Sequence, residues 1–277
     1  DDDIQLYVPF RWGLEGDHEK AHQRLGGCIK EVKEWMNGNC LVFNESKTEF
    51  MYIQSPHHHH KYTKQPLRLG MTVVHPKDKV RNLGVTFDNC INMKLQVSSV
   101  VSSCHNQLRK LGRVRKNLTT KACENAVKSI VTSRLDYCNS LLYGSGSTQQ
   151  ARLQKIQNNA ARIITLTKKY DHISPILHSL HWLPITKSVK FKILTLVYKC
   201  QHAIAPKYLM ELIPSYIPPR SLRSSNQSNI QTPSVKRKVA EGAFSVAAPK
   251  LWNPLPLSIK KAESLSKFKR LLKTHLF

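Results

Sequence analysis

The first part of the chain alternates between strand-like and helix-like spacing of its apolar residues. Residues 1–10 begin with acidic side chains and then carry apolar groups at every second position, which predicts a half-buried strand. Residues 17–37 place apolar side chains three and four positions apart, which predicts a helix capped by Asp17 and ended by Gly38. Further strands are expected at 50–53, 67–74 and 80–87. Gly84, inside the last of them, indicates a bulge or a close backbone approach.

From residue 92 onward the apolar spacing is helical almost to the end of the chain. The clearest stripe lies in residues 92–116 and consists of Val97, Val100, Cys104, Leu108 and Leu111. The same spacing predicts helices at 119–135, 148–167, 187–203, 206–213 and 264–275. A Gly- and Ser-rich linker precedes the second of these, with Ser147 as its expected cap.

Residues 214–240 break the helical pattern. They contain four prolines, many Ser and Asn residues and few large apolar groups, which predicts an extended, flexible linker. Aromatic and apolar side chains return at 243–256, before the last helix. Taken together, these elements predict an α+β fold that is mostly α.

The chain is strongly basic, and the excess is uneven. It has 43 Lys and Arg against 18 Asp and Glu, a net charge of +25 and a pI near 9.9. Residues 141–277 contribute +18, with 22 basic and four acidic side chains. Such a segment repels itself unless a polyanion is present, and nucleic acid is the usual partner because neutralised phosphates release counterions. A merely basic surface is the alternative that charge alone leaves open.

Cysteine usage and the chain start bear on the compartment. The seven cysteines are scattered and form no Cys-x-x-Cys pair, so zinc-knuckle spacing is absent. Without a signal-like N-terminus, this pattern predicts reduced thiols in an intracellular protein. No apolar stretch approaches the ~18 residues of a membrane span, so no membrane partner is expected. Because the chain opens with three Asp and no Met, we expect it to begin inside a longer protein.

Short motifs then follow one another in a consistent order. The first are Asp2-Asp3-Ile4-Gln5-Leu6-Tyr7, Trp35 with Leu41, Asn44 and Lys47-Thr48-Glu49, and Asn82-Leu83-Gly84-Val85. The later ones are S-R-L-D-Y-C-N at 133–139, L-H-W-L-P-I at 180–185, P-K-Y-L at 206–209, L-R-S-S at 222–225 and L-W-N-P-L-P at 251–256. Each motif is weak alone, but their ordered succession resembles the C-terminal part of a LINE-type, jockey-like non-LTR retrotransposon reverse transcriptase, an RNA-directed DNA polymerase.

The resemblance implies a domain organisation. Residues 1–88 would be a small reverse-transcriptase palm remnant, with the end of the catalytic motif and the strands that follow it. A helical thumb and post-thumb region would occupy 89–213. The flexible linker at 214–240 and a C-terminal segment at 241–277, which ends in an amphipathic helix, would complete the chain.

Asp2 and Asp3 match the family's catalytic turn. In the intact family, two Mg²⁺ ions about 3.5–4 Å apart activate the attacking 3′-hydroxyl and stabilise the leaving oxygen. This chain has Asp1 where the family has Ala, and the upstream strand with a further Asp is not part of it. Because a metal site needs its complete ligand set, we expect a vestigial pair, no bound cofactor and no polymerase activity from this chain alone. The three Asp residues are otherwise a solvated tail.

Two further candidates have competing explanations. Lys47 matches a family lysine that neutralises or protonates departing pyrophosphate, and the alternative is an ordinary lysine at a strand edge. His57–His60 would suit Zn²⁺, Cu²⁺ or Ni²⁺. No acidic or Cys residue accompanies this run and the family pattern lacks it, so we expect a solvated loop.

Basic and aromatic side chains are the remaining candidates. Five cations gather at the C-terminal end of helix 92–116, where a thumb helix would contact phosphates: Arg109, Lys110, Arg113, Arg115 and Lys116. Cations at this place also suit the helix dipole. The predicted linker contains three further cations, Lys236, Arg237 and Lys238. They are interpreted as an RNA clamp, as a nuclear-import patch or as an ordinary run of charges. Trp182 and Trp252 suit base stacking or, preferably, core anchoring.

Three hypotheses for function remain. In the first, the chain is a polymerase fragment that retains template and primer binding at most, with RNA or an RNA–DNA hybrid as partner, in the nucleus or a cytoplasmic ribonucleoprotein. In the second, it is an active polymerase, which requires the upstream half. In the third, it is a co-opted helical protein-interaction module without a nucleic-acid function.

Overall fold

The computed structural model describes residues 4–11, 13–54, 64–70, 72–217, 228–235 and 238–277. The chain divides into two compact units, Asp1–Ile91 (unit 1) and Asn92–Phe277 (unit 2). The described part is mostly helical with a few short strands, which confirms the expected α+β, mostly α, fold class. Among the described residues, no helix combines the length and the apolar character that a bilayer crossing requires.

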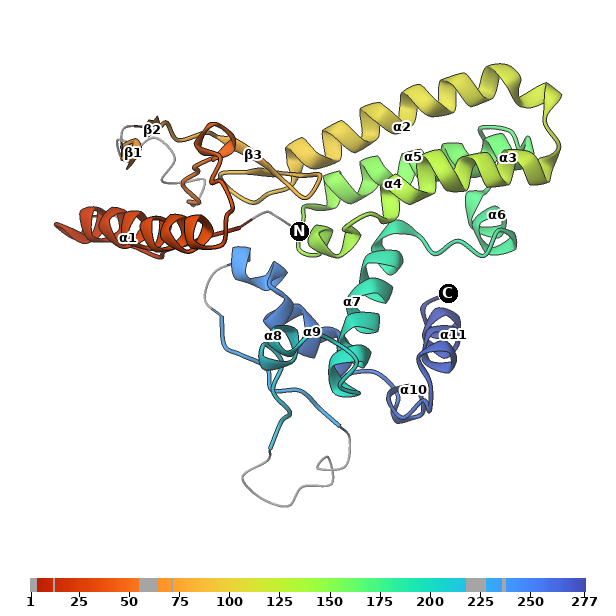
Figure 1. Ribbon diagram of the computed structural model, residues 1–277. Coiled ribbons are helices and arrows are strands. Elements are labelled where there is room, and N and C mark those ends of the chain that lie inside the picture. Colours follow the sequence, from red (N-terminus) through yellow and green to blue (C-terminus); the bar gives the residue numbers. More distant parts are fainter. Residues whose placement is uncertain (1–3, 12, 55–63, 71, 218–227, 236–237) are drawn as a thin grey trace. The chain divides into compact units, whose positions relative to one another are not determined.

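Unit 1 combines one long helix with two small hairpins (Figure 1). Its elements are α1 (Asp17–Gly38), the 3₁₀ turn η1 (Glu45–Lys47), β1 (Leu67–Leu69), β2 (Thr72–Val74), β3 (Lys79–Asn82) and β4 (Val85–Asp88). β1 pairs antiparallel with β2, and β3 pairs antiparallel with β4, in two separate sheets. Ile29 of α1 packs against the first hairpin, so the small core of this unit joins helix and strands: Leu67, Leu69 and Val74, with Leu6, Leu25, Phe43 and Phe50 around them.

The expected strands of unit 1 differ from the observed ones. The segments 67–74 and 80–87 are each a hairpin. Leu83 and Gly84 have φ angles of 45° and 79°, and positive φ at both central residues is typical of the type I′ turn that suits strand twist. Residues 4–10 form no strand with any described segment. At 50–53 only Phe50 makes a bridge, to Pro76, which lacks the N–H that would extend a ladder.

Unit 2 is built almost entirely from helices. They are α2 (Lys94–Val114), α3 (Thr120–Val127), α4 (Ser133–Asp136), α5 (Ser147–Thr165), α6 (Ile173–Ser179), α7 (Ile185–Gln201), α8 (Lys207–Glu211), α9 (Phe244–Trp252), α10 (Leu257–Lys260) and α11 (Leu265–Leu276). A π-helical segment, Lys128–Thr132, joins α3 to α4, so the expected helix at 119–135 is continuous but locally widened. The 3₁₀ turns η3 (Arg115–Asn117), η5 (Asn139–Leu142) and η6 (Lys238–Gly242) complete the unit.

The first core of unit 2 lies where α2 runs along α5 (Figure 1). The apolar stripe expected on α2 is confirmed at four of its five positions, because Val97, Cys104, Leu108 and Leu111 are buried, while Val100 is partly buried. The opposing face of α5 supplies small and branched side chains: Leu153, Ile156, Ala160, Ala161 and Ile164. Close approach of two helices over such a stripe is how most helical stability arises in proteins.

A second core joins α7, α9 and α11. Tyr198 stacks on Phe268 with ring centroids 4.3 Å apart, and Trp252 lies 6.0 Å from Phe268. The Tyr198 hydroxyl donates to the Ala262 carbonyl at 2.7 Å, so this buried aromatic has its polar end satisfied. Trp252 is only 1% exposed, which confirms core anchoring for this residue, whereas Trp182 is half-buried.

Part of the expected linker is anchored. Ser215 and Ile230 form an antiparallel bridge, and Ile230 is buried. The Asn253 side chain accepts from the Ile230 N–H and donates to its carbonyl, both at 2.9 Å. Trp252 Nε1 donates to the Ser228 carbonyl at 2.9 Å. This described stretch is therefore packed on α9 rather than extended in solvent.

Candidate functional site

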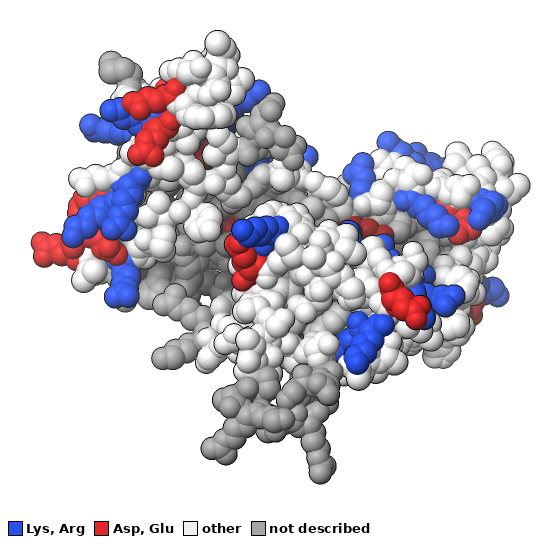
Figure 2. Space-filling view, turned by 60° about the horizontal axis from the view of Figure 1, so that its bottom comes forward, with Lys and Arg blue, Asp and Glu red and all other residues white. Residues whose placement is uncertain are grey.

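The entire net charge of the chain comes from unit 2. Residues 92–277 contain 31 Lys and Arg and six Asp and Glu, whereas residues 1–91 contain 12 of each kind. On the face shown in Figure 2, Lys and Arg side chains lie in several separate groups, some of them beside an acidic side chain. The electrostatic argument for a polyanion therefore applies to unit 2 alone.

Half of the acids of unit 2 are already paired with neighbouring lysines. Glu124 lies 2.6 Å from Lys128 and 3.4 Å from Lys121. The hydrogen bond from Lys128 is the main cause that lowers the pKa of the Glu124 carboxyl. Two more pairs are Lys267–Glu263 at 3.0 Å and Lys250–Glu241 at 3.6 Å. With 31 cations and six acids in its sequence, unit 2 has far too few carboxylates to neutralise most of its cations.

The cations at the C-terminal end of α2 lie mainly on its exposed side. Arg109, Lys110 and Arg113 are exposed, as is Lys116 in η3. By helical geometry they point away from the stripe that Cys104, Leu108 and Leu111 bury against α5. None of the four makes a salt bridge to a residue of the described part. The structure therefore brings these four side chains together as a solvent-facing stripe, here called the α2 cation stripe.

Arg115 has a different position from its neighbours. Its side chain is buried, and the residue is only 8% exposed. Nε and Nη2 donate to the carbonyls of Ile163 and Ile164 at 2.7 and 2.8 Å, and Nη1 donates to that of Leu118 at 2.8 Å. The carbonyls of Ile163 and Ile164 belong to the last turn of α5, where they lack helical partners. Arg115 is thus used inside the fold, and we leave it out of the proposed phosphate contacts.

The sequence contained a signal for this burial. Arg115 follows Leu111 by four positions, so it continues the apolar stripe of α2 instead of the exposed face. Of the remaining basic candidates, Lys236 and Arg237 lie outside the described residues, and Lys238 begins η6.

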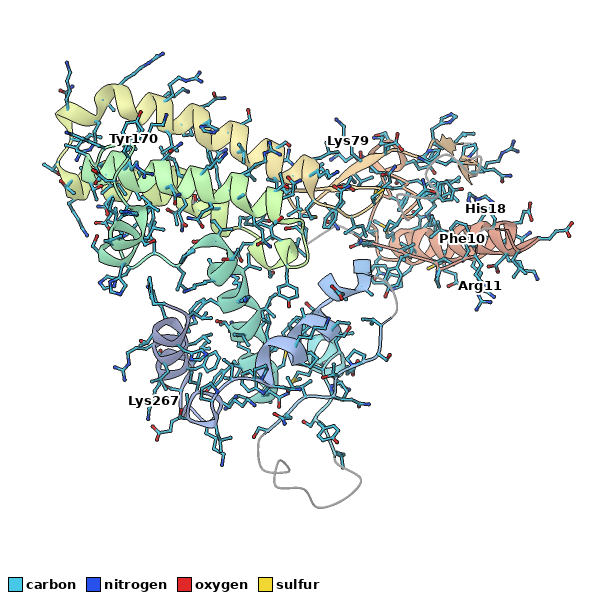
Figure 3. All side chains as sticks on the ribbon, turned by 180° about the vertical axis from the view of Figure 1, so that it is seen from behind. Phe10, Arg11, His18, Lys79, Tyr170 and Lys267 are labelled. Carbon is cyan, nitrogen blue, oxygen red and sulfur yellow. The ribbon has the colours of Figure 1, made fainter. Side chains whose placement is uncertain are left out.

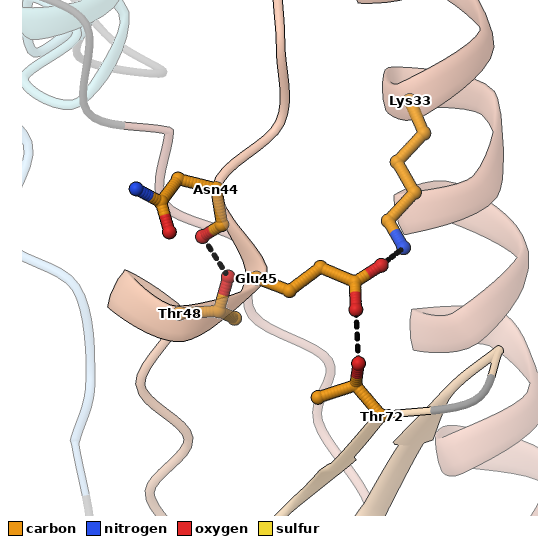
Figure 4. Close-up of polar contacts among 5 residues, drawn as sticks. All are labelled: Lys33, Asn44, Glu45, Thr48 and Thr72. Atoms are coloured by element: carbon orange, nitrogen blue, oxygen red, sulfur yellow. Dashed lines mark hydrogen bonds and ion pairs between the residues drawn. The ribbon is translucent and has the colours of Figure 1, made fainter.

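The segment around Lys47 is a compact turn. The Asn44 side chain caps η1 by accepting from the Lys47 N–H at 3.2 Å, and Thr48 Oγ1 donates to the Asn44 carbonyl at 3.2 Å. Glu45 accepts hydrogen bonds from both Lys33 of α1 and Thr72 of β2, as Figure 4 shows. Most polar groups of the motif therefore hold unit 1 together.

Lys47 itself is exposed, with no described side-chain partner. The next acid of the motif, Glu49, lies 2.7 Å from Lys77 and accepts from the Arg81 N–H at 3.4 Å. The Lys77 hydrogen bond is the main cause that lowers the pKa of Glu49. The Lys47 side chain thus remains a candidate for contact with an anion from solution, whereas the polar groups of its neighbours Asn44, Glu45 and Glu49 make contacts within unit 1.

The structure does not test the acidic and histidine candidates for a metal site. Asp2, Asp3 and His57–His60 lie outside the described residues. Among the residues that the structure does describe, no three His, Cys, Asp or Glu side chains gather in one place. The Mg²⁺ ions of the intact family therefore stay an expectation. None of the seven cysteines, all of which lie in the described part of the chain, forms a disulfide bond.

Comparisons with known proteins identify no relative on which function could rest. No protein-family model, curated protein or solved structure matches this chain.

Proposed function

We propose that unit 2 binds the phosphate backbone of RNA or of an RNA–DNA hybrid, as part of a LINE-type reverse transcriptase. The observation that carries this is the charge distribution: unit 2 has all of the net charge, and the α2 cation stripe faces solvent. Backbone contacts of this kind position a protein on a duplex without selecting sequence.

Under this proposal unit 1 corresponds to the end of a polymerase palm and unit 2 to the thumb and the region after it. Support comes from the ordered motifs of the sequence and from the long helix that carries its cations on one side. The role of the chain in the nucleus or in a cytoplasmic ribonucleoprotein follows from the same proposal.

The test is binding of the full chain to labelled RNA–DNA hybrids of unrelated sequence across a salt series. We expect similar affinity for all sequences and a steep fall of affinity with salt, because counterion release is the driving force. The variant Arg109→Gln, Lys110→Gln, Arg113→Gln, Lys116→Gln should bind more weakly. Its slope of log affinity against log salt should be smaller in magnitude by about 3.6, for four lost phosphate contacts on a duplex.

A matched control removes the same charge from unit 1. Lys20→Gln, Arg24→Gln, Arg68→Gln and Lys79→Gln also change four exposed cations, one of which, Lys79, is labelled in Figure 3. We expect this control to retain the wild-type salt slope. Equal losses in both variants would mean that diffuse charge, and not the α2 cation stripe, binds the backbone.

One observation favours a second candidate function, a protein-interaction module. Ile204, Tyr208 and Leu212 lie four residues apart around α8 and are 60%, 66% and 47% exposed. Tyr208 in α8 and Leu212 at its C-cap are one helical turn apart and so lie on one side of the helix, whereas Ile204 precedes the helix. A chain that binds no hybrid at low salt, but retains a protein partner at high salt, would support this alternative.

A further inference from the structure

Two histidines of unit 1 converge on one buried phenol. His18 and His22 are one helical turn apart on α1, and their ring centroids are 4.4 Å apart. Nε2 of His18 lies 2.8 Å from the Tyr52 hydroxyl, and Nε2 of His22 lies 2.6 Å from it. Tyr52 is only 4% exposed. Three side chains that can bind metals thus point their ligand atoms at one place.

Two phenylalanine rings pack against the His18, His22 and Tyr52 side chains. Phe10, labelled with His18 in Figure 3, lies edge-on to that imidazole with ring centroids 5.3 Å apart. Phe50 lies edge-on to Tyr52 at 4.9 Å and to His22 at 5.6 Å. Rings held on several sides have few alternative rotamers, so the three ligand atoms are kept in position before any ion arrives.

Without an ion, hydrogen bonds hold the His18, His22 and Tyr52 side chains together. The Tyr52 hydroxyl donates to the Gln65 carbonyl at 3.0 Å, so its oxygen can accept from both imidazoles. Burial, with His18 as a smaller cause, lowers the pKa of His22, and neutral imidazole is the form that binds metals. Burial also raises the pKa of Tyr52 to about 12. A cation at this oxygen would have to displace the phenol proton to solvent, as metals do with other protic ligands.

We propose that His18, His22 and Tyr52 form a binding site for a divalent transition-metal ion of the Zn²⁺ type, with both Nε2 atoms and the phenol oxygen as ligands. Zn–N bonds of about 2.0–2.1 Å place tetrahedral ligand atoms roughly 3.3 Å apart. The present N–O separations of 2.6 and 2.8 Å therefore need to open by about 0.5–0.7 Å, which side-chain adjustment can supply. Imidazole ligands favour Zn²⁺, Cu²⁺ and Ni²⁺ over Mg²⁺ and Ca²⁺. This site is independent of nucleic-acid binding by unit 2.

The test is calorimetric titration of the full chain with Zn²⁺, and the background must be chosen with care. The imidazoles of the run His57–His60 suit the same ions, so the reference protein carries His57→Asn, His58→Asn, His59→Asn and His60→Asn. In this background we expect one Zn²⁺ per chain. His18→Gln and His22→Gln should each weaken binding at least about tenfold, and Tyr52→Phe should weaken it less.

The matched control is His75→Gln, which changes an exposed histidine of the same unit and should leave Zn²⁺ affinity unchanged. Circular dichroism of each variant shows whether it folds. If a histidine variant unfolds, the Tyr52→Phe variant and the visible spectrum of bound Co²⁺ decide. An intense four-coordinate Co²⁺ spectrum that changes in Tyr52→Phe supports the site. No Zn²⁺ binding in the reference protein, or affinity equal to that of the His18→Gln and His22→Gln variants, would overturn it and leave only a hydrogen-bonded phenol.

Discussion

Arg115 donates from all three of its guanidinium nitrogens to main-chain carbonyls, two of them at the last turn of α5. We expect Arg115→Met to lower the free energy of unfolding by about 3 kcal/mol, because buried carbonyls lose charged donors. Arg115→Lys should recover only part of this loss, since one ammonium cannot match the planar fork. Denaturant unfolding gives the values.

The neighbouring Arg113 is the matched control for this prediction. It is exposed near the end of α2, two residues before Arg115, so Arg113→Met should change stability by no more than about 0.5 kcal/mol. Similar losses in both variants would show that Arg115 is not the cap of α5 described above. Nucleic-acid binding should respond in the opposite order, with Arg113 the more important of the two.

Glu49 allows a pH prediction at the residue scale. Its pKa is lowered, mainly by the hydrogen bond from Lys77, so its contribution to stability is present above the ordinary carboxyl pKa of 4.5 and is lost as pH falls through the folded value. We expect Glu49→Gln to cost about 0.5–1 kcal/mol at pH 7, since the pair is partly exposed. That difference should vanish in acid. Glu31→Gln, at an exposed position of α1, should change the free energy of unfolding at pH 7 by no more than about 0.5 kcal/mol.

At the scale of elements, the C-terminal end of α9 anchors the stretch around Ile230, within the expected linker 214–240. Asn253 exchanges two hydrogen bonds with Ile230, as a second strand would. We expect Asn253→Ala to cost about 1–3 kcal/mol, because the Ile230 amide and carbonyl lose their partners in a buried place. Hydrogen exchange of the Ile230 amide should accelerate. Asn159→Ala, at an exposed position of α5, should leave that exchange rate unchanged.

The helices were the most predictable elements, for a physical reason that α2 shows. Its stripe from Val97 to Leu111 repeats over several turns, so one misplaced residue does not obscure the period. α9 escaped prediction because Pro249 interrupts its sequence, although the helix continues around it. The apolar spacing alone missed the hairpin at Leu83 and Gly84, because a turn of two residues inside an apolar run leaves the strand period nearly intact.

The sequence shows which residues of the candidate site are basic, but it does not show which groups their side chains contact. A cluster of cations at 109–116 is visible in the sequence, while the burial of Arg115 depends on where α5 ends in space. In the same way, His18 and His22 have the spacing of one helical face. Tyr52, thirty residues later, joins them only through the tertiary packing of unit 1. Such convergence of distant residues carries no local sequence signal.

At the scale of the molecule, one chain combines a strongly basic unit with a unit of zero net charge. Unit 2 has a net charge of +25 and unit 1 has none. Like charges within a compact body raise the free energy of its folded state, and a bound polyanion removes that cost. Stability of the two units should therefore respond differently to one ligand.

We expect an RNA–DNA hybrid at low salt to slow amide hydrogen exchange throughout residues 92–277, because a ligand that binds only the folded state stabilises it by mass action. A hybrid present at about 100 times its dissociation constant would add about 2.7 kcal/mol to the protection of amides that exchange by unfolding of unit 2. Amides of α1 should be unaffected. At 1 M salt the added protection should disappear, since screening acts within about 3 Å. Equal protection of both units would show that the uneven charge does not decide where the hybrid binds.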